Sequence, residues 1–258
     1  MNAIEIAICQ CGTPFEREIE PDRIDGVLTL IMPQTHCPNC QASLRVEYER
    51  REAARRELLA QQKADELQQA QRRTLDAVTK ATPPRFQTTD VSHPKFNARA
   101  WQRLKGWSPT NEHPWLGLGG ETGTCKTRVS YLLASDYLQS ITTSDRRPTF
   151  AFMAAYDLGP AVMRLFSNDY SDKARARAVL DLLRTADFLL LDDLGKLRLT
   201  PAIAEEVFSL LNHRHEYLLT TIWTANSQPE EIAAGLPPDM AAPFAGRLLE
   251  CSKIVRLQ

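Results

Sequence analysis

A glycine-rich segment between a strand-like and a helix-like stretch constrains the fold of this chain more than any other feature. Residues 115–118 form a short apolar run, residues 119–127 read Gly-Gly-Glu-Thr-Gly-Thr-Cys-Lys-Thr, and residues 128–139 carry the apolar spacing of a helix. Such a loop can wrap phosphate groups, because glycine lets the backbone approach closely and the amides at a helix start attract negative charge. The segment predicts a phosphate-binding turn in an α/β domain; a chance glycine-rich turn before a helix is the alternative.

Each position of this loop has an expected role. The residues predicted to bind the nucleotide are Gly120, Glu121, Thr122, Gly123, Thr124, Cys125, Lys126 and Thr127. Lys126 is expected to reach the terminal phosphates, and Thr127 to bind Mg²⁺. Cys125 stands where the pattern G-x-x-x-x-G-K-[ST] has its second glycine. We expect a side chain to be tolerated there if its φ is negative.

Two acids and an amide follow later strands. Residues 188–193 read Phe-Leu-Leu-Leu-Asp-Asp, an apolar strand that ends in Asp192 and Asp193. At the tip of a parallel strand beside a phosphate loop, Asp192 would hold the magnesium through water and Asp193 would polarise the attacking water. Asn226 ends the β-rich run 218–226, where it would bridge the γ-phosphate and the lytic water. With the apolar runs 149–154 and 253–257, these strands predict a parallel sheet covered by helices on both faces.

The N-terminal 44 residues contain two close cysteine pairs. The ligands expected for a structural zinc ion are Cys9, Cys11, Cys37 and Cys40, and His36 is an alternative ligand. We expect residues 15–20 and 26–32 to pair as a hairpin that brings the two pairs together, as in a zinc ribbon. Four free cysteines in a small subdomain are the alternative.

A charged helix is predicted over residues 45–80, which contain neither proline nor glycine. Its apolar stripe is thin, so it is either a spacer or a surface that packs on a partner. The chain of 258 residues has 31 basic and 32 acidic side chains, and the net charge of −1 excludes a globally basic nucleic-acid binder. It has no run of 18 apolar residues and no basic, apolar leader, so we expect a cytoplasmic protein without a membrane partner.

The order of these motifs resembles that of the AAA+ ATPases of the DnaC/IstB-like group, which are bacterial and phage helicase loaders and transposition helper ATPases. The resemblance covers about residues 82–258. It rests on a proline-rich entry motif at 82–86, a Walker A motif at 120–127, a Walker B motif at 189–195, a sensor 1 stretch at 211–226 and a Gly-Arg-Leu sequence within 244–248. This last stretch is similar to the Ser-Arg-Leu box of the family, with Gly246 in place of serine.

The resemblance implies an AAA+ core with five parallel strands at 83–258. The cysteine pairs and the charged stretch place a zinc-ribbon-like module at 1–44 and a linker helix at 45–82 before it. The resemblance implies hydrolysis of ATP to ADP and phosphate, and we expect the departure at Cys125 to slow this reaction. Because the sequence stops just after the last predicted strand, we expect no helical lid. Lys126, Asp193, Asn226 and Arg247 would be catalytic, with Arg247 acting on the ATP of a neighbouring subunit in a ring or spiral.

The resemblance also places single-stranded DNA contacts between the second strand and Walker B. That segment holds Phe166, Tyr170, Lys173, Arg175 and Arg177, which suit phosphate contact and base stacking; a solvated helix face explains them as well. We therefore expect an ATPase that loads a replicative helicase, with the N-terminal module and helix docking the helicase. A transposition helper ATPase and a nucleotide-gated binding module with little hydrolysis are the alternatives.

Overall fold

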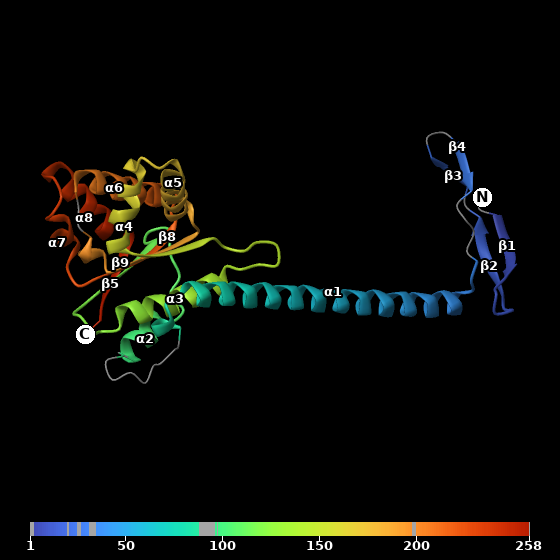
Figure 1. Ribbon diagram of the computed structural model, residues 1–258. Coiled ribbons are helices and arrows are strands. Elements are labelled where there is room, and N and C mark those ends of the chain that lie inside the picture. The colour runs from blue at the N-terminus through green and yellow to red at the C-terminus, as the bar shows by residue number, and fades with distance from the viewer. Residues whose placement is uncertain are drawn as a thin grey trace. The chain divides into compact units, whose positions relative to one another are not determined.

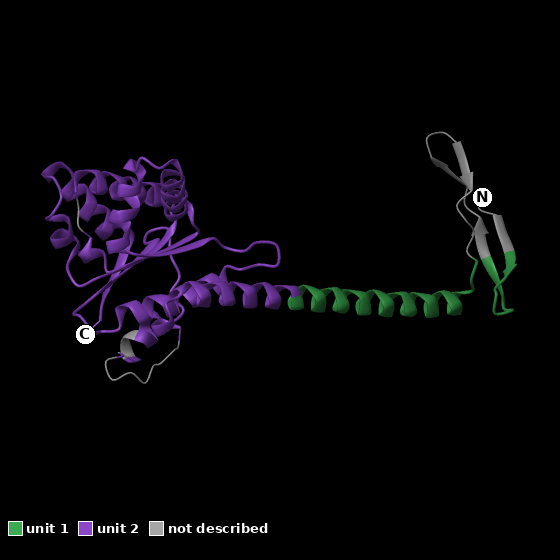
Figure 2. Cartoon of the chain, in the orientation of Figure 1, with its two compact units in different colours: residues 1–65 green, residues 66–258 purple. Residues whose placement is uncertain are grey.

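The chain is built from two units, and a long helix, α1 (Pro38–Ala81), runs through both of them. The computed structural model describes residues 3–19, 21–24, 27–30, 35–87, 96, 98–197 and 200–257. The first unit spans residues 1–65 and the second spans 66–258 (Figures 1 and 2). The boundary between them lies inside α1, whereas the sequence predicts divisions at residues 44 and 82.

The second unit is organised around a five-stranded sheet in which all neighbours are parallel. Its strands are β5 (Trp115–Gly119), β6 (Phe150–Ala154), β7 (Phe188–Asp192), β8 (Thr220–Ala225) and β9 (Ser252–Arg256). Their order is β6-β7-β8-β5-β9, so the carboxyl ends of β5, β7 and β8 meet at one edge. The predicted α/β class with five parallel strands is confirmed.

Helices cover both faces of this sheet because its strands alternate their apolar side chains between two cores. Leu189 and Leu191 of β7 belong to one core and Leu190 to the other. Helices α4, α5, α6 and α8 cover the first face, and α3 covers the second (Figure 1). The helical elements are α2 (Ala98–Leu104), α3 (Lys126–Ser140), α4 (Ala155–Met163), α5 (Tyr170–Thr185), α6 (Pro201–Glu216), α7 (Pro229–Ala233) and α8 (Pro238–Cys251), with 3₁₀ turns η1 (Pro84–Phe86), η2 (Arg164–Phe166) and η3 (Leu194–Lys196). Within the described parts of the chain, no helix combines the length and apolarity needed to cross a bilayer.

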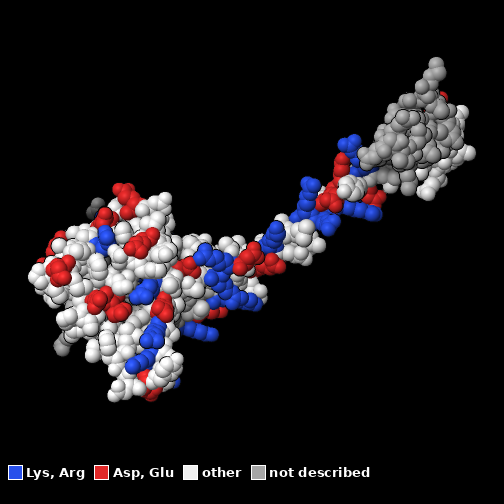
Figure 3. All heavy atoms as spheres, turned by 90° about the horizontal axis from the view of Figure 1, so that it is seen from above, with Lys and Arg blue, Asp and Glu red and all other residues white. Residues whose placement is uncertain are grey.

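Helix α1 confirms the predicted charged helix, although it begins at Pro38, earlier than residue 45. Charges of both signs alternate along it (Figure 3), and an ion pair of 3.0 Å joins Arg45 to Glu49. Its C-terminal part belongs to the second unit and packs on the rest of that unit, where Thr74 and Val78 are buried and the Thr142 hydroxyl donates to Thr74 at 3.1 Å. The C-terminal part of the thin apolar stripe, with Val78, is therefore part of the core of the second unit.

Two short hairpins form the strands of the first unit. Strand β1 (Ala3–Ile8) pairs antiparallel with β2 (Pro14–Ile19), and β3 (Pro21–Ile24) pairs antiparallel with β4 (Val27–Leu30). The predicted pairing of residues 15–20 with 26–32 is wrong, although residues 20, 26, 31 and 32 lie outside the described residues. Each strand pairs with its sequence neighbour, which closes the shorter loop at the lower entropic cost.

Candidate functional site

The glycine-rich loop leaves the sheet at the end of β5 and enters α3 at Lys126. Gly120 has a φ of +140° and Gly123 a φ of +89°, both conformations that favour glycine. A Cβ at Gly120 would overlap the carbonyl oxygen of Leu257, whose amide donates to Gly119 at 2.8 Å. The loop therefore lies tightly against the end of β9, and glycine is required at residue 120.

The side chain of Lys126 lies inside this loop and is hydrogen-bonded to its backbone. Its Nζ donates to the carbonyl oxygens of Gly120 and Glu121, each at 2.8 Å. Burial lowers the pKa of this ammonium, and the carboxylates of Asp193 and Asp192 act in the opposite direction. A cation held inside a ring of backbone groups at a helix start is the arrangement that binds phosphate.

Three side chains join the loop to β7 and β8. The Thr127 hydroxyl, at the start of α3, donates to the Asp192 carboxylate at 2.9 Å, and the Thr224 hydroxyl donates to it at 2.7 Å. The backbone amide of Asp193 donates to the Thr224 oxygen at 2.8 Å. Burial raises the pKa of Asp192, while the hydrogen bonds from Thr224 and Thr127 lower it. Hydroxyl and carboxylate oxygens are donors that suit Mg²⁺, so Thr127 and Asp192 fit the metal expected there.

Asp193 and Asn226 lie at the same edge of the sheet. The Asp193 carboxylate forms an ion pair of 2.7 Å with Lys196 in η3. The Asn226 side chain donates to the Thr122 hydroxyl of the loop at 3.3 Å. A pocket of about 290 Å³ brings these groups together, and its lining consists of Arg85, Phe86, Thr122, Gly123, Cys125, Lys126, Thr127, Arg128, Asp193, Lys196 and Asn226.

Two of these lining residues, and one residue that supports the site from behind, were not expected from the sequence as contacts. Arg128 and Lys196 lie outside the motif positions, and Thr224 supports the site from a fully buried strand position. Threonine is common in strands, so no sequence signal separates Thr224 from an ordinary strand residue. Phe86 of the entry motif stacks on Tyr131 with ring centroids 5.7 Å apart, which attaches η1 to α3.

Cys125 departs from the expected backbone conformation. Its φ is +62°, in the left-handed region, and it caps the N-terminus of α3. The negative φ under which we expected a side chain to be tolerated is not found, because the loop keeps the turn that a glycine normally makes there. For a residue with a Cβ, this conformation lowers the free energy of unfolding by roughly 1–2 kcal/mol.

The other predicted residues lie away from this pocket. Arg247 in α8 donates to Asn212 at 3.1 Å and pairs with Glu250 at 3.1 Å, and it is not among the described lining residues. Phe166 ends η2 and Tyr170 begins α5, and their side chains are 63% and 83% exposed. The charged members of that group, Lys173, Arg175 and Arg177, lie on α5.

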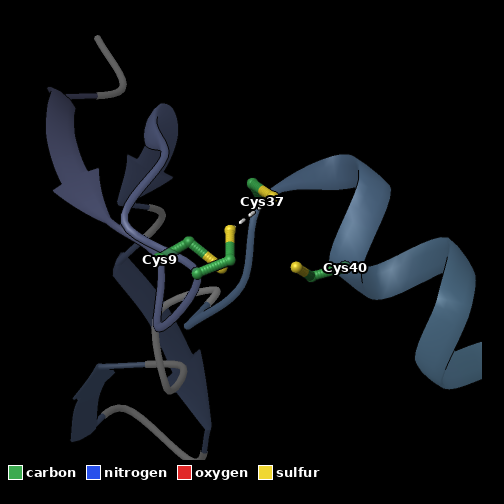
Figure 4. Close-up of side chains that lie close together, drawn as sticks. Cys9, Cys37 and Cys40 are labelled. Atoms are coloured by element: carbon green, nitrogen blue, oxygen red, sulfur yellow. Dashed lines mark hydrogen bonds between the residues drawn. The ribbon is translucent and has the colours of Figure 1, made fainter.

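The four N-terminal cysteines converge in the first unit. The sulfur atoms of Cys9, Cys11, Cys37 and Cys40 all lie within 4.8 Å of one another, and Figure 4 shows side chains from the β1–β2 turn facing the start of α1. Hydrogen bonds with Thr13 lower the pKa of Cys11 to about 6, and hydrogen bonds with the neighbouring thiols raise the pKa of Cys40 to about 12. Four sulfur donors at this spacing fit one tetrahedral soft metal ion.

His36 does not join this group. Its Nδ1 atom hydrogen-bonds with the Thr35 hydroxyl at 2.8 Å, and the cluster is complete with four sulfur atoms. The alternative in which His36 replaces a cysteine is therefore not the arrangement of the structure.

Replacing Cys125 by glycine should stabilise the second unit, because glycine adopts the observed φ without strain. We expect Cys125→Gly to raise the free energy of unfolding by about 1 kcal/mol, and Cys125→Val to lower it, since a β-branched residue fits this region worst. Urea unfolding measures both changes. Cys125→Ala is the matched control, because it removes the thiol and keeps the Cβ. Equal stability of the glycine and alanine variants would contradict the assigned strain.

Comparison with known proteins places this site in context. No protein-family model matches the chain. Over 151 residues, 57% of the chain, it is 26% identical to the replicative helicase loader DnaI of Bacillus subtilis strain 168. That match covers 45% of the relative, so the chain corresponds to less than half of its length.

Solved structures give a weaker likeness. A crystal structure of DnaI has a TM-score of 0.49 at 18% identity, covering 63% of this chain and 82% of that one. The DnaC helicase loader has a TM-score of 0.47 at 23% identity, with coverages of 66% and 95%. AMPPCP-bound DnaA from Aquifex aeolicus has a TM-score of 0.48 at 18% identity, with coverages of 63% and 46%. The strand order and the phosphate loop are those of an AAA+-like P-loop fold, and the sequence is similar to that of the helicase loader DnaI.

Proposed function

We propose that this protein binds and hydrolyses ATP and uses the cycle to load a replicative helicase onto DNA. One observation supports the ATP site above all others, namely the hydrogen bond of 2.9 Å between Thr127 and Asp192. It joins the residue after the loop lysine to the acid that ends β7, although the two are 65 positions apart. Such an alignment of a phosphate loop with a strand-end acid is the arrangement that phosphoryl-transfer enzymes use.

The proposed roles follow from the contacts of each side chain. Lys126 would leave the carbonyl groups of Gly120 and Glu121 for the phosphates. Thr127 and Asp192 would hold Mg²⁺, which supplies positive charge against the phosphate oxygens. Asp193 would accept a hydrogen bond from the attacking water, whose oxygen bonds to the γ-phosphorus as the bond to the β–γ bridging oxygen breaks.

The other proposed roles concern the pocket rim and its partners. Asn226, already bonded to Thr122, would orient the water or the γ-phosphate. The remaining loop positions, Glu121 to Cys125, would surround the phosphates with backbone amides. Arg247 would reach the ATP of an adjacent subunit once the contact with Asn212 is released, in a ring or spiral formed with ATP.

The helicase partner is proposed from the sequence match to DnaI, whose name states that role. Residues 1–44 and the helix over 45–82 would dock the helicase, and residues 83–258 would form the ATPase domain. Exposed Phe166 and Tyr170, with the cations of α5, would contact single-stranded DNA by stacking and charge.

A nucleotide-gated module with little turnover is a second candidate, favoured by one observation. The strained φ of +62° at Cys125 alters the loop that faces the phosphates. Measurement of ATP binding beside ATP hydrolysis distinguishes this candidate from the ATPase, because only the ATPase releases phosphate in the wild type.

Lys126→Ala should abolish ATP binding, whereas Asp193→Asn should bind ATP and lose turnover. Lysine contacts the phosphates of the ground state, but the acid acts on the water in the transition state. We expect the rate of phosphate release by Asp193→Asn to fall about 10²- to 10⁴-fold. Equilibrium dialysis with ATP measures binding. Asp145→Asn, an exposed acid outside the pocket, is the matched control, and wild-type turnover by Asp193→Asn would refute its proposed role.

The rate of ATP hydrolysis per chain should rise with protein concentration and rise further with single-stranded DNA. Without the Arg247 of a neighbour, little charge balances the transferring phosphoryl group, and an absent arginine finger costs about 10³- to 10⁵-fold in rate. Mixing Arg247→Ala with Asp193→Asn chains should restore part of the activity, since one complete site forms at their junction. A flat specific activity across the monomer-to-oligomer transition, or an inactive mixture, would exclude a shared site.

We also propose that the four-cysteine cluster binds one structural zinc ion, because four protein ligands leave no open position for chemistry. Protein purified without chelator should contain one equivalent of zinc by elemental analysis. Cys37→Ser should lose it and lose the folded first unit, since a unit this small depends on its metal. Cys125→Ser, outside the cluster, should retain the full equivalent. A metal-free wild type would rule the site out.

A further inference from the structure

Lys196 is a cation in the candidate nucleotide pocket that the sequence motifs do not assign. It ends η3, the 3₁₀ turn that follows β7 directly, and lines the same pocket as Lys126 and Asn226. Its Nζ lies 2.7 Å from the carboxylate of Asp193, three positions earlier. The acid proposed to act on water is thus already engaged by a lysine of its own chain.

The two members of this pair differ in how firmly they are held. The amide of Asp193 donates to Thr224 at 2.8 Å, and its φ of +58° fixes the turn after β7. Its side chain is 25% exposed, whereas that of Lys196 is 60% exposed. A long side chain with a solvated head loses little when it changes partners. Lys196 is therefore the partner that can move.

The space around Lys196 allows such a movement. On one side lies the nucleotide pocket, and on the other Lys196 lines a second pocket with Tyr156, Met163 and Thr200. Lys126, by contrast, is 6% exposed and bonded to two carbonyl oxygens of the loop. Lys196 is thus a cation that faces the pocket with a single carboxylate as the hydrogen-bond partner described for it.

We propose that Lys196 distinguishes ATP from ADP by exchanging the Asp193 carboxylate for the γ-phosphate. This inference rests on the proposed ATP site. A terminal phosphate carries more negative charge than one carboxylate and offers three acceptor oxygens, so it competes for the ammonium. ADP has no γ-phosphate and leaves the pair intact. The exchange frees the Asp193 oxygen atoms to accept a hydrogen bond from water only when ATP is present.

Calorimetric titration with AMPPCP and with ADP, each with Mg²⁺, tests this exchange. Lys196→Met keeps the aliphatic stem and removes the charge. We expect it to weaken AMPPCP binding about tenfold or more, the size of one charge-assisted hydrogen bond, and to change ADP binding less than twofold. Lys196→Arg should retain most of the preference for AMPPCP. Lys253→Met, an exposed lysine on β9 outside the pocket, is the matched control.

A double-mutant cycle makes the test specific to the exchange. In Asp193→Asn the lysine loses its anionic partner, so AMPPCP should bind more tightly than to the wild type. In the double variant Lys196→Met/Asp193→Asn this gain should shrink or vanish, because the lysine that produced it is absent. Unchanged ADP binding shows in the same titrations that each variant is folded.

Three outcomes separate the possible errors. If Lys196→Met weakens AMPPCP and ADP equally, Lys196 provides general charge and the exchange is wrong. If it weakens neither, the ion pair with Asp193 is purely structural and the exchange is also wrong. If wild-type protein binds neither nucleotide, the proposed ATP site itself is wrong. The first two outcomes contradict only the exchange and leave the proposed ATP site standing.

Discussion

The candidate site depends on one half-buried carboxylate, Asp192, which receives hydroxyl hydrogen bonds from two different elements. Thr127 comes from the start of α3 and Thr224 from β8, at 2.9 and 2.7 Å. Since a carboxylate that is partly removed from water is costly unless it accepts hydrogen bonds, these two donors favour the placement of β5, β7 and β8 that brings them together. The parallel register then sets the phosphate loop, the two acids and Asn226 at one edge of the sheet.

The parts of the fold predicted from sequence are those with a local pattern. The apolar runs gave the strands of the sheet, and the Lys-Thr pair after a glycine turn gave the start of α3, because periodicity and glycine act over a few residues. The hairpins of the first unit could not be assigned in this way. Several short strands with similar β-propensity can pair in more than one combination, and the turns between them decide the choice.

The same limit applies within the site. Lys126 and Asp192 follow from motif spacing, whereas Thr224 and Lys196 are ordinary residues until the sheet places them beside Asp192 and Asp193. Cys125 is the opposite case. The motif identified the residue correctly, but its left-handed backbone conformation did not follow from the sequence. A substitution for glycine leaves the backbone of the loop unchanged when surrounding contacts fix it, so strain remains at the substituted residue. Asp193, which lines the same pocket, also has a left-handed φ of +58°, a conformation that aspartate adopts more readily than most residues.

A fully buried charge connects the site to the rest of the sheet. Arg214 is fully buried in α6, and its guanidinium donates to the carbonyl oxygens of Leu183 and Ala186 at the end of α5, at 3.0 and 2.9 Å. It also donates to the Thr220 carbonyl at the start of β8, at 2.6 Å, and burial lowers its pKa to about 9.

These bonds join the C-terminal end of α5 to the strand that carries Thr224 and Asn226. The N-terminal end of α5, with Tyr170, is exposed and lacks such an anchor among the described contacts. Of the five hydrogen bonds that Arg214 donates, three reach carbonyl oxygens at the C-terminal end of α5 and two reach Thr220 and Thr221 of β8. One buried side chain therefore fixes the spacing between that helix end and the strand that leads to the nucleotide pocket.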